Sequence, residues 1–221
     1  MEFINSDAES ALKAALNSVG KNSRVVICGD PDEEEILQEQ IKSSTQSVSD
    51  MIKLSSSIDA SEWFQQRKKA LIEEYDQHGE DFLSIEGVWS GQLYKHSILM
   101  HRDLLSGELG ENVLLAKLDV DSSWQIPAYF KYGGWNDCPD TEVHCAVWKH
   151  WFKQYGAEIV SVSHDVFEAW VPRPPGDEKA AMSLAWEQFL YCGDIVYQGV
   201  ESVANLAGTL LNGNSWYFWW D

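Results

Sequence analysis

The sequence lacks an apolar run that approaches the roughly 18–20 residues needed to cross a membrane. Its first sixteen residues also lack the basic segment and apolar core of a secretory signal. It has only four cysteines, and none of them forms a Cys-x-x-Cys pair. These absences predict a cytoplasmic protein without a membrane partner, whose cysteines stay reduced and lie buried as small hydrophobic side chains.

Several catalytic and cofactor-binding motifs are absent as well. The chain contains no GxSxG elbow, no HExxH pair, no P-loop lysine motif and no GxGxxG dinucleotide fingerprint. No spacing of cysteine and histidine matches a known zinc pattern. We therefore expect no metal and no cofactor, and a non-enzymatic role is favoured, although a new kind of catalytic site stays open.

Basic side chains are scarce: 16 lysines and arginines face 35 aspartates and glutamates, so the formal net charge is −19. The excess is spread along the chain, with 20 acids against 10 bases in residues 1–110 and 15 against 6 in residues 111–221. A surface this negative repels phosphate groups, which argues against a nucleic-acid partner. The same charge favours association with a basic protein, although acidity can also serve solubility alone.

Tryptophan, by contrast, is abundant, with 11 in 221 residues. Two of them precede residue 112, and the other nine follow it. With 44% hydrophobic residues, the chain can bury a substantial core. We interpret most of these tryptophans as core residues of the second half, and an aromatic groove for a partner side chain or a sugar is the alternative.

Hydrophobic periodicity and capping residues predict a mixture of helices and strands. The predicted helices cover about 6–19, 33–42, 59–79, 139–155, 177–191 and 200–211, with a weak helix or ordered linker at 43–57. The predicted strands are 24–28, 83–93, 96–105, 113–120, 124–130, 157–162, 166–171 and 215–221. Pro127 makes 124–130 an edge or bulged strand, and aromatic residues on both faces make 215–221 a central or covered strand. Without a regular βαβ rhythm the fold class is α+β, a mixed and largely antiparallel sheet packed against several helices.

Several unusual sequence motifs follow one another in the last hundred residues. They are Trp124-Gln-Ile-Pro-Ala-Tyr-Phe, Gly133-Gly-Trp-Asn-Asp-Cys-Pro, Trp151-Phe-Lys-Gln-Tyr-Gly-Ala-Glu, Glu187-Gln-Phe, Cys192-Gly-Asp-Ile-Val-Tyr-Gln-Gly and Trp216-Tyr-Phe-Trp-Trp-Asp. This part resembles a bacterial family of unknown function, marked by a GGWNxCP loop and a WYFWWD end. The resemblance implies a C-terminal α+β domain at 112–221 and no activity. Residues 1–111 form an unassigned N-terminal α+β region.

The loop at 133–138 is the most suggestive place for a binding site. Gly133 and Gly134 permit positive φ and a close backbone approach. Trp135, Asn136 and Asp137 would then stand just before a helix N-terminus, which can bind an anion. A structural turn, with Trp135 plugging the core and Asn136 or Asp137 capping the helix, is the alternative.

Four further residues complete the candidate site. Cys138 and His144 could form a nucleophile–base pair or, with Cys192, a metal site; a core histidine satisfied by a hydrogen bond is the alternative. Asp194 and Gln198 could be buried and paired near the loop as an internal brace.

Three functions follow from these observations. The first is an acidic, non-enzymatic binding protein, such as an immunity protein that neutralises a basic toxin domain. The second is a small-ligand-binding protein or enzyme that uses a Trp-lined pocket at the 133–138 loop. The third is a regulatory adaptor whose N-terminal half carries the interface. The charge favours the first.

Overall fold

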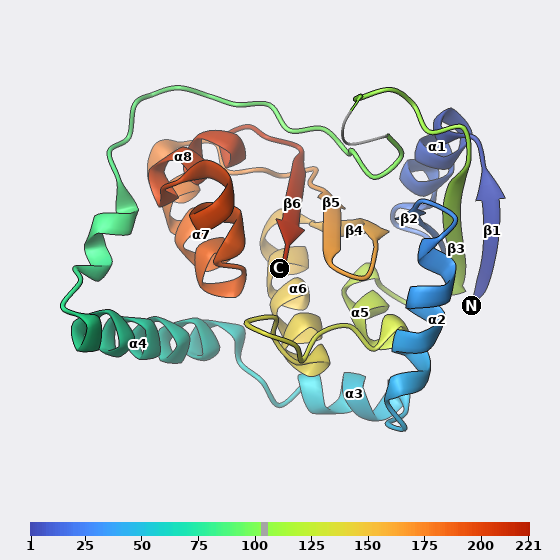
Figure 1. Cartoon of the computed structure of the whole chain (residues 1–221), viewed down its shortest axis with the longest axis horizontal. Coiled ribbons are helices and arrows are strands. Elements are labelled where there is room, and N and C mark those ends of the chain that lie inside the picture. The colour runs from blue at the N-terminus through green and yellow to red at the C-terminus, as the bar shows by residue number, and fades with distance from the viewer. Residues whose placement is uncertain (103–105) are drawn as a thin grey trace.

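The computed structural model describes residues 1–102 and 106–221. These residues form a mixed, mostly antiparallel sheet with helices on both faces, which confirms the predicted α+β class (Figure 1). The strands are β1 (Glu2–Ser6), β2 (Ser23–Gly29), β3 (Val113–Asp119), β4 (Glu158–Val162), β5 (Val166–Trp170) and β6 (Ser215–Trp219). The α-helices are α1 (Ala8–Ser18), α2 (Glu33–Ser43), α3 (Val48–Ser55), α4 (Ala60–His78), α5 (Ile126–Phe130), α6 (Thr141–Tyr155), α7 (Glu178–Tyr191) and α8 (Val203–Leu210).

Three short helical segments join these elements: the 3₁₀ helices η1 (Phe82–Glu86) and η2 (Ser123–Gln125), and the π-helix η3 (Ile195–Val200). Within the two described ranges, no helix combines the length and the hydropathy that a bilayer crossing requires.

The strand order in the sheet is β1-β3-β2-β4-β5-β6. All neighbours are antiparallel except β2 and β4, which run parallel and meet at the pair Ile27 and Ser161. A buried ion pair between Arg24 and Glu158, with 3.0 Å between nitrogen and oxygen, also joins β2 to β4. The sheet therefore takes strands from both sides of residue 112, and β2 lies between β3 and β4.

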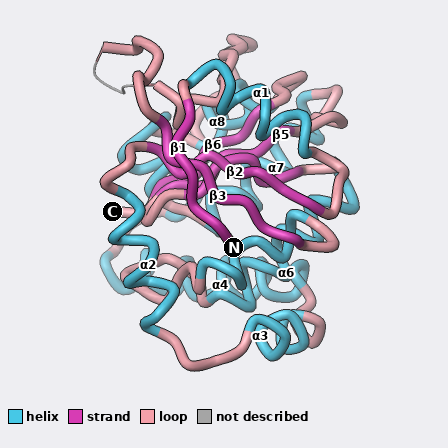
Figure 2. The backbone as a smooth tube through the Cα atoms, turned by 90° about the vertical axis from the view of Figure 1, so that its right-hand side faces the viewer, coloured by secondary structure: helices cyan, strands magenta, loops and turns pink. Residues whose placement is uncertain are grey.

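Alternation along the strands separates two cores. In β2, Val26 and Cys28 point into the main core, and Ile27 points to the opposite face, where the alanines of α1 cover it. Figure 2 shows α1 on one side of the sheet and α4 and α6 on the other. The main core also holds the aromatic residues of α6, α7 and β6. Most tryptophans of the second half are therefore packing residues.

Two segments were wrongly predicted as strands. Residues 124–130 form η2 and α5, because Pro127 occupies the first turn of a helix, where its missing N–H costs nothing. Residues 83–93 contain η1 followed by an extended loop, and residues 96–102 also belong to no strand. The end of the predicted strand at 96–105 lies outside the described residues. This loop bonds to other elements instead, as Tyr94 N–H does to the carbonyl oxygen of Gly208 at 3.0 Å.

Three smaller predictions also need correction. β1 occupies residues for which no strand was predicted, and the first helix begins at Ala8 after its N-cap Asp7, two residues later than the predicted start at residue 6. Asp140, rather than Asn136 or Asp137, is the N-cap residue of α6. β6 lies at the edge of the sheet: Trp216, Phe218 and Trp220 are buried, whereas Tyr217 and Trp219 are half-buried.

The position of β2 makes a prediction about the isolated second half. A fragment of residues 112–221 lacks both β1 and β2, so β3 loses both of its hydrogen-bonded neighbours and only β4, β5 and β6 stay paired. We expect the fragment to show no cooperative urea transition by tryptophan fluorescence, in contrast to the full chain. Co-expression with residues 1–111 should restore the transition. A fragment that unfolds cooperatively at the midpoint of the full chain would contradict this expectation.

Candidate functional site

The loop at 133–138 folds back tightly on itself. Gly133, Gly134 and Asn136 all have positive φ, at 101°, 86° and 46°. A Cβ atom on Gly133 would lie 1.9 Å from the carbonyl oxygen of Pro139, so no other residue fits there. That carbonyl accepts a hydrogen bond from the N–H of Gly134 at 3.1 Å. The two glycines therefore serve the turn itself.

Beneath the loop, His144 is fully buried and both ring nitrogens have partners. Nδ1 lies 2.5 Å from the hydroxyl oxygen of Tyr191, and Nε2 lies 3.3 Å from Sγ of Cys138. The indole N–H of Trp148 donates to the same Tyr191 oxygen at 2.9 Å. In the neutral tautomer with its proton on Nε2, the ring accepts at Nδ1 from the Tyr191 hydroxyl, which itself accepts from Trp148.

Burial fixes the protonation states of this cluster. It lowers the pKa of His144 to about 3 and raises the pKa of the Cys138 thiol. A general base must take up a proton near the working pH, and a nucleophilic cysteine must reach the thiolate. At neutral pH neither group does so, and Cys138 is only 5% exposed. The sequence placed these two residues together correctly, and their geometry gives them a packing role.

Cys192 does not complete a metal site with them. Its thiol donates to the main-chain oxygen of Trp219 at 3.0 Å, and burial raises its pKa. Among the residues with described positions, no three histidine, cysteine, aspartate or glutamate side chains are grouped to hold a metal ion.

Trp135 has a different environment from the residues beneath it. Its ring meets that of Tyr132 edge-on, with 4.9 Å between centroids, and the side chain is half-buried rather than a core plug. It lines an open depression of about 400 Å³. The depression is lined by Ile36, Gln40, Trp135, His164, Asp165, Trp219, Trp220 and Asp221. We call this the Trp135 depression.

Polar residues predicted for the site brace the rim of this depression. The side-chain amide of Asn136 donates to the main-chain oxygen of Asp221 at 2.6 Å, and the N–H of Asp221 donates to Asp194 at 3.1 Å. Gln198 donates to the other oxygen of Asp194 at 3.2 Å. The predicted brace therefore exists, but it is not buried: Gln198 is exposed and Asp194 half-buried. Asp137 is also exposed and pairs with Arg67 at 3.4 Å.

The acidic flank of the depression was not predicted from the sequence. Helix α2 carries Glu34, Glu35 and Glu39 beside Ile36, which is 44% exposed and lines both the Trp135 depression and the adjoining acidic surface. On the other side, Asp165 accepts from the indole N–H of Trp219 at 3.0 Å. The run Glu33, Glu34 and Glu35 at the start of α2 was the available signal, since two of these three residues belong to the acidic surface.

The protonation state of His144 leads to a prediction about pH. In the unfolded chain the imidazole takes up a proton below its ordinary pKa of 6.5, whereas in the folded protein it does so only near 3. The unfolded state therefore binds more protons across this window, and stability falls as pH falls from 6.5 towards 3. His144 changes the free energy of unfolding by at most about 1.4 kcal/mol per pH unit.

The measurement is urea unfolding between pH 7 and pH 4.5. We expect His144→Gln to be less stable than wild type at pH 7 and to lose less stability on acidification, by about 1–3 kcal/mol over this range. His78→Gln, which changes an exposed histidine of α4, is the control and should follow wild type. Parallel curves for wild type and His144→Gln would refute a neutral, buried His144.

Comparison with known proteins gives a family without an activity. No curated protein and no solved structure matches the chain. Residues 114–221, which contain nearly all of β3 and everything after it, match the family described as Domain of unknown function (DUF4253). This part of the chain is therefore similar to a family of unknown function, as its sequence motifs predicted.

Proposed function

We propose that this is a bacterial, cytoplasmic, non-enzymatic binding protein whose partner is a basic protein, such as a toxin domain that it neutralises as an immunity protein. The observation that carries the proposal is the Trp135 depression with carboxylates on both sides. A lysine or arginine side chain inserted there would contact tryptophan side chains and nearby negative charge.

The energies of such a contact are favourable for a cationic side chain. A cation over an aromatic ring gains roughly 0.5–1 kcal/mol at an exposed site and about 2 kcal/mol when water is excluded. Asp165 and Asp221 line the depression, and Glu34, Glu35 and Glu39 stand on the adjoining surface of α2. The half-buried Trp135 supplies an anchor of the type that dominates protein interfaces.

The net charge of −19 acts over a longer range. Complementary charge accelerates the encounter of two proteins, and the effect weakens as salt screens it. The partner of such an inhibitor, a basic nuclease-like domain, carries the positive surface needed to hold nucleic acid. The inhibitor therefore gains from the local contact at the depression and from the long-range attraction between opposite charges. We therefore expect the protein to associate with its partner rapidly and in a way that depends on the salt concentration.

The first experiment identifies the partner and measures its affinity. The tagged full-length protein is used to capture proteins from the host lysate and, separately, the product of the neighbouring gene. The captured protein is then purified and titrated by calorimetry at 50 and 300 mM NaCl. We expect a basic partner whose affinity falls at least tenfold at the higher salt concentration. Recovery of no basic partner would contradict the proposal.

Point variants locate the contact. We expect Trp135→Ala and Glu35→Lys each to weaken binding of this partner by about tenfold or more, because they remove the anchor and reverse a flanking charge. Trp63→Ala, at a half-buried tryptophan of α4, and Glu80→Lys, at an exposed glutamate, are matched controls. Equal effects of the control and test variants would place the interface elsewhere.

A further inference from the structure

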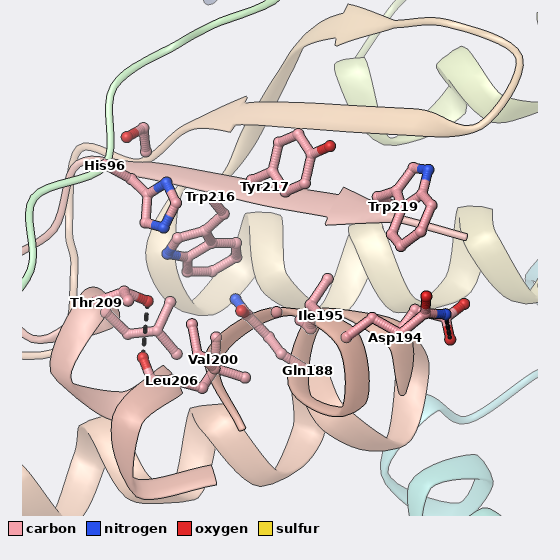
Figure 3. A pocket seen from close by; sticks show the side chains of 14 residues that line it. His96, Gln188, Asp194, Ile195, Val200, Leu206, Thr209, Trp216, Tyr217 and Trp219 are labelled. Atoms are coloured by element: carbon pink, nitrogen blue, oxygen red, sulfur yellow. Dashed lines mark hydrogen bonds between the residues drawn. The ribbon is translucent and has the colours of Figure 1, made fainter. Parts of the chain in front are cut away.

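A second cavity lies between β6 and the helices α7, η3 and α8, and Trp219 lines both this cavity and the Trp135 depression. It has a volume of about 260 Å³. Its walls are largely apolar, and Trp216 of β6 faces Ile195, Val200 and Leu206 of the helical side (Figure 3). We call it the α7–α8 cavity. Its size suits a single small molecule rather than a dinucleotide or a peptide.

Three polar atoms in the wall of this cavity have no hydrogen-bond partner. They are Nε2 of Gln188, Oγ of Ser215 and Nε1 of Trp216. The three residues are 1%, 6% and 2% exposed. Buried polar groups in native proteins are almost always paired, and each exception needs an explanation. Three such atoms lie in the wall of one cavity, which makes this cavity the place to consider for a bound molecule.

The chemistry of these atoms defines what that partner must offer. The amide nitrogen of Gln188 and the indole nitrogen of Trp216 can only donate, and the hydroxyl of Ser215 can donate or accept. A ligand that pairs with Gln188 and Trp216 must therefore present an acceptor oxygen or nitrogen. Between apolar walls, a carbonyl on a small hydrophobic frame meets both requirements.

The charges around the cavity favour an uncharged ligand over an anion. The carboxylate of Asp194 stands at one end and already accepts from Gln198 and from the N–H of Asp221. At the other end, desolvation lowers the pKa of His96, so this ring brings no positive charge near pH 7. A carboxylate ligand would meet repulsion from Asp194 without a compensating cation.

The backbone around the cavity is also unusual. Ile195–Val200 forms a π-helix, a wide turn that occurs often at functional sites. The extended segment that carries His96 crosses α8, and its Tyr94 N–H bonds to the carbonyl oxygen of Gly208. Further along, the N–H groups of Leu99 and Met100 donate to the buried carboxylate of Glu168 on β5 at 2.6 and 3.1 Å. The segment is thus fixed on both sides of His96.

We propose that the α7–α8 cavity binds a small, uncharged, largely apolar molecule whose carbonyl oxygen accepts hydrogen bonds from Gln188 and Trp216. This site does not depend on the Trp135 depression or on a protein partner, so the two proposals can fail separately.

The test uses benzamide as the probe, with toluene and benzoate as matched compounds. Toluene lacks the acceptor, and benzoate carries a negative charge. The readout is the indole N–H resonance of Trp216 in the ¹⁵N-labelled full-length protein, assigned with Trp216→Phe. We expect benzamide to shift this resonance in a saturable way, and toluene and benzoate to bind at least tenfold more weakly.

The matched variant is Gln188→Met, which keeps the shape of the side chain and removes the unpaired amide. We expect it to weaken benzamide binding at least tenfold and to raise the melting temperature of the ligand-free protein by roughly 2–4 °C, because a buried donor without a partner is destabilising. Gln66→Met, on the exposed face of α4, should change neither quantity. If Gln188→Met does not fold, Gln188→Leu serves for the same measurements.

Three results would overturn the proposal. The first is a Trp216 resonance that benzamide leaves unmoved at millimolar concentration. The second is equal affinity for benzamide and toluene, which would mean that the polar atoms play no part. The third is a crystal structure in which ordered waters bond all three polar atoms and stay there in the presence of benzamide.

Discussion

The hydrogen bond between Tyr191 and His144 is the interaction on which the second half of this protein depends. It joins the last residue of α7 to the core face of α6, and through Nε2 of His144 it reaches the 133–138 loop. Trp148 completes the network by donating to the same tyrosine. Because every member is buried, loss of one partner would leave another polar group unpaired in a low-dielectric interior. The loop therefore keeps its shape through side chains that no ligand can reach.

This satisfied network contrasts with the α7–α8 cavity, which also borders α7. Both ring nitrogens of the buried His144 have partners inside the protein, which makes the histidine a structural element. The polar atoms of Gln188 and Trp216 in the α7–α8 cavity are also buried, but they have no hydrogen-bond partner. Buried polar groups in native proteins are normally paired. The pairing of His144 therefore indicates a packing role, and the unpaired atoms of the α7–α8 cavity support the proposed ligand site. Cys138 and His144 are residue types found in catalytic sites, but burial keeps both side chains neutral at pH 7. The α7–α8 cavity has no such pair and is the proposed ligand site.

The sheet places a second constraint on the molecule. The segment that matches the family of unknown function supplies β4, β5, β6 and nearly all of β3, yet β2 lies between β3 and β4. The first half therefore contributes a strand to the middle of the sheet. It also contributes α2, whose carboxylates flank the Trp135 depression. Both the fold and the proposed interface draw on the two halves of the chain.

The sequence by itself determined the fold class, most helices and the strands with clear alternation, because these follow from local periodicity and capping. It also brought Cys138 and His144 together, since six residues at a loop–helix junction fix their separation. It failed at Pro127, where the choice between an edge strand and a first helical turn depends on neighbouring elements. It failed again at residues 83–102, which form the end of η1 and then a loop that joins no strand of the sheet.

Only the tertiary structure decided the protonation of His144, because the shift depends on burial by distant segments. It alone placed Trp135 beside α2, a helix about one hundred residues earlier in the chain. Gln188 was visible in the sequence as a polar residue on an apolar helix, and that signal was overlooked. Its lack of a partner, however, is a property of the assembled cavity. Local pattern sets the elements, and long-range packing decides which polar groups are satisfied and which remain to bind something else.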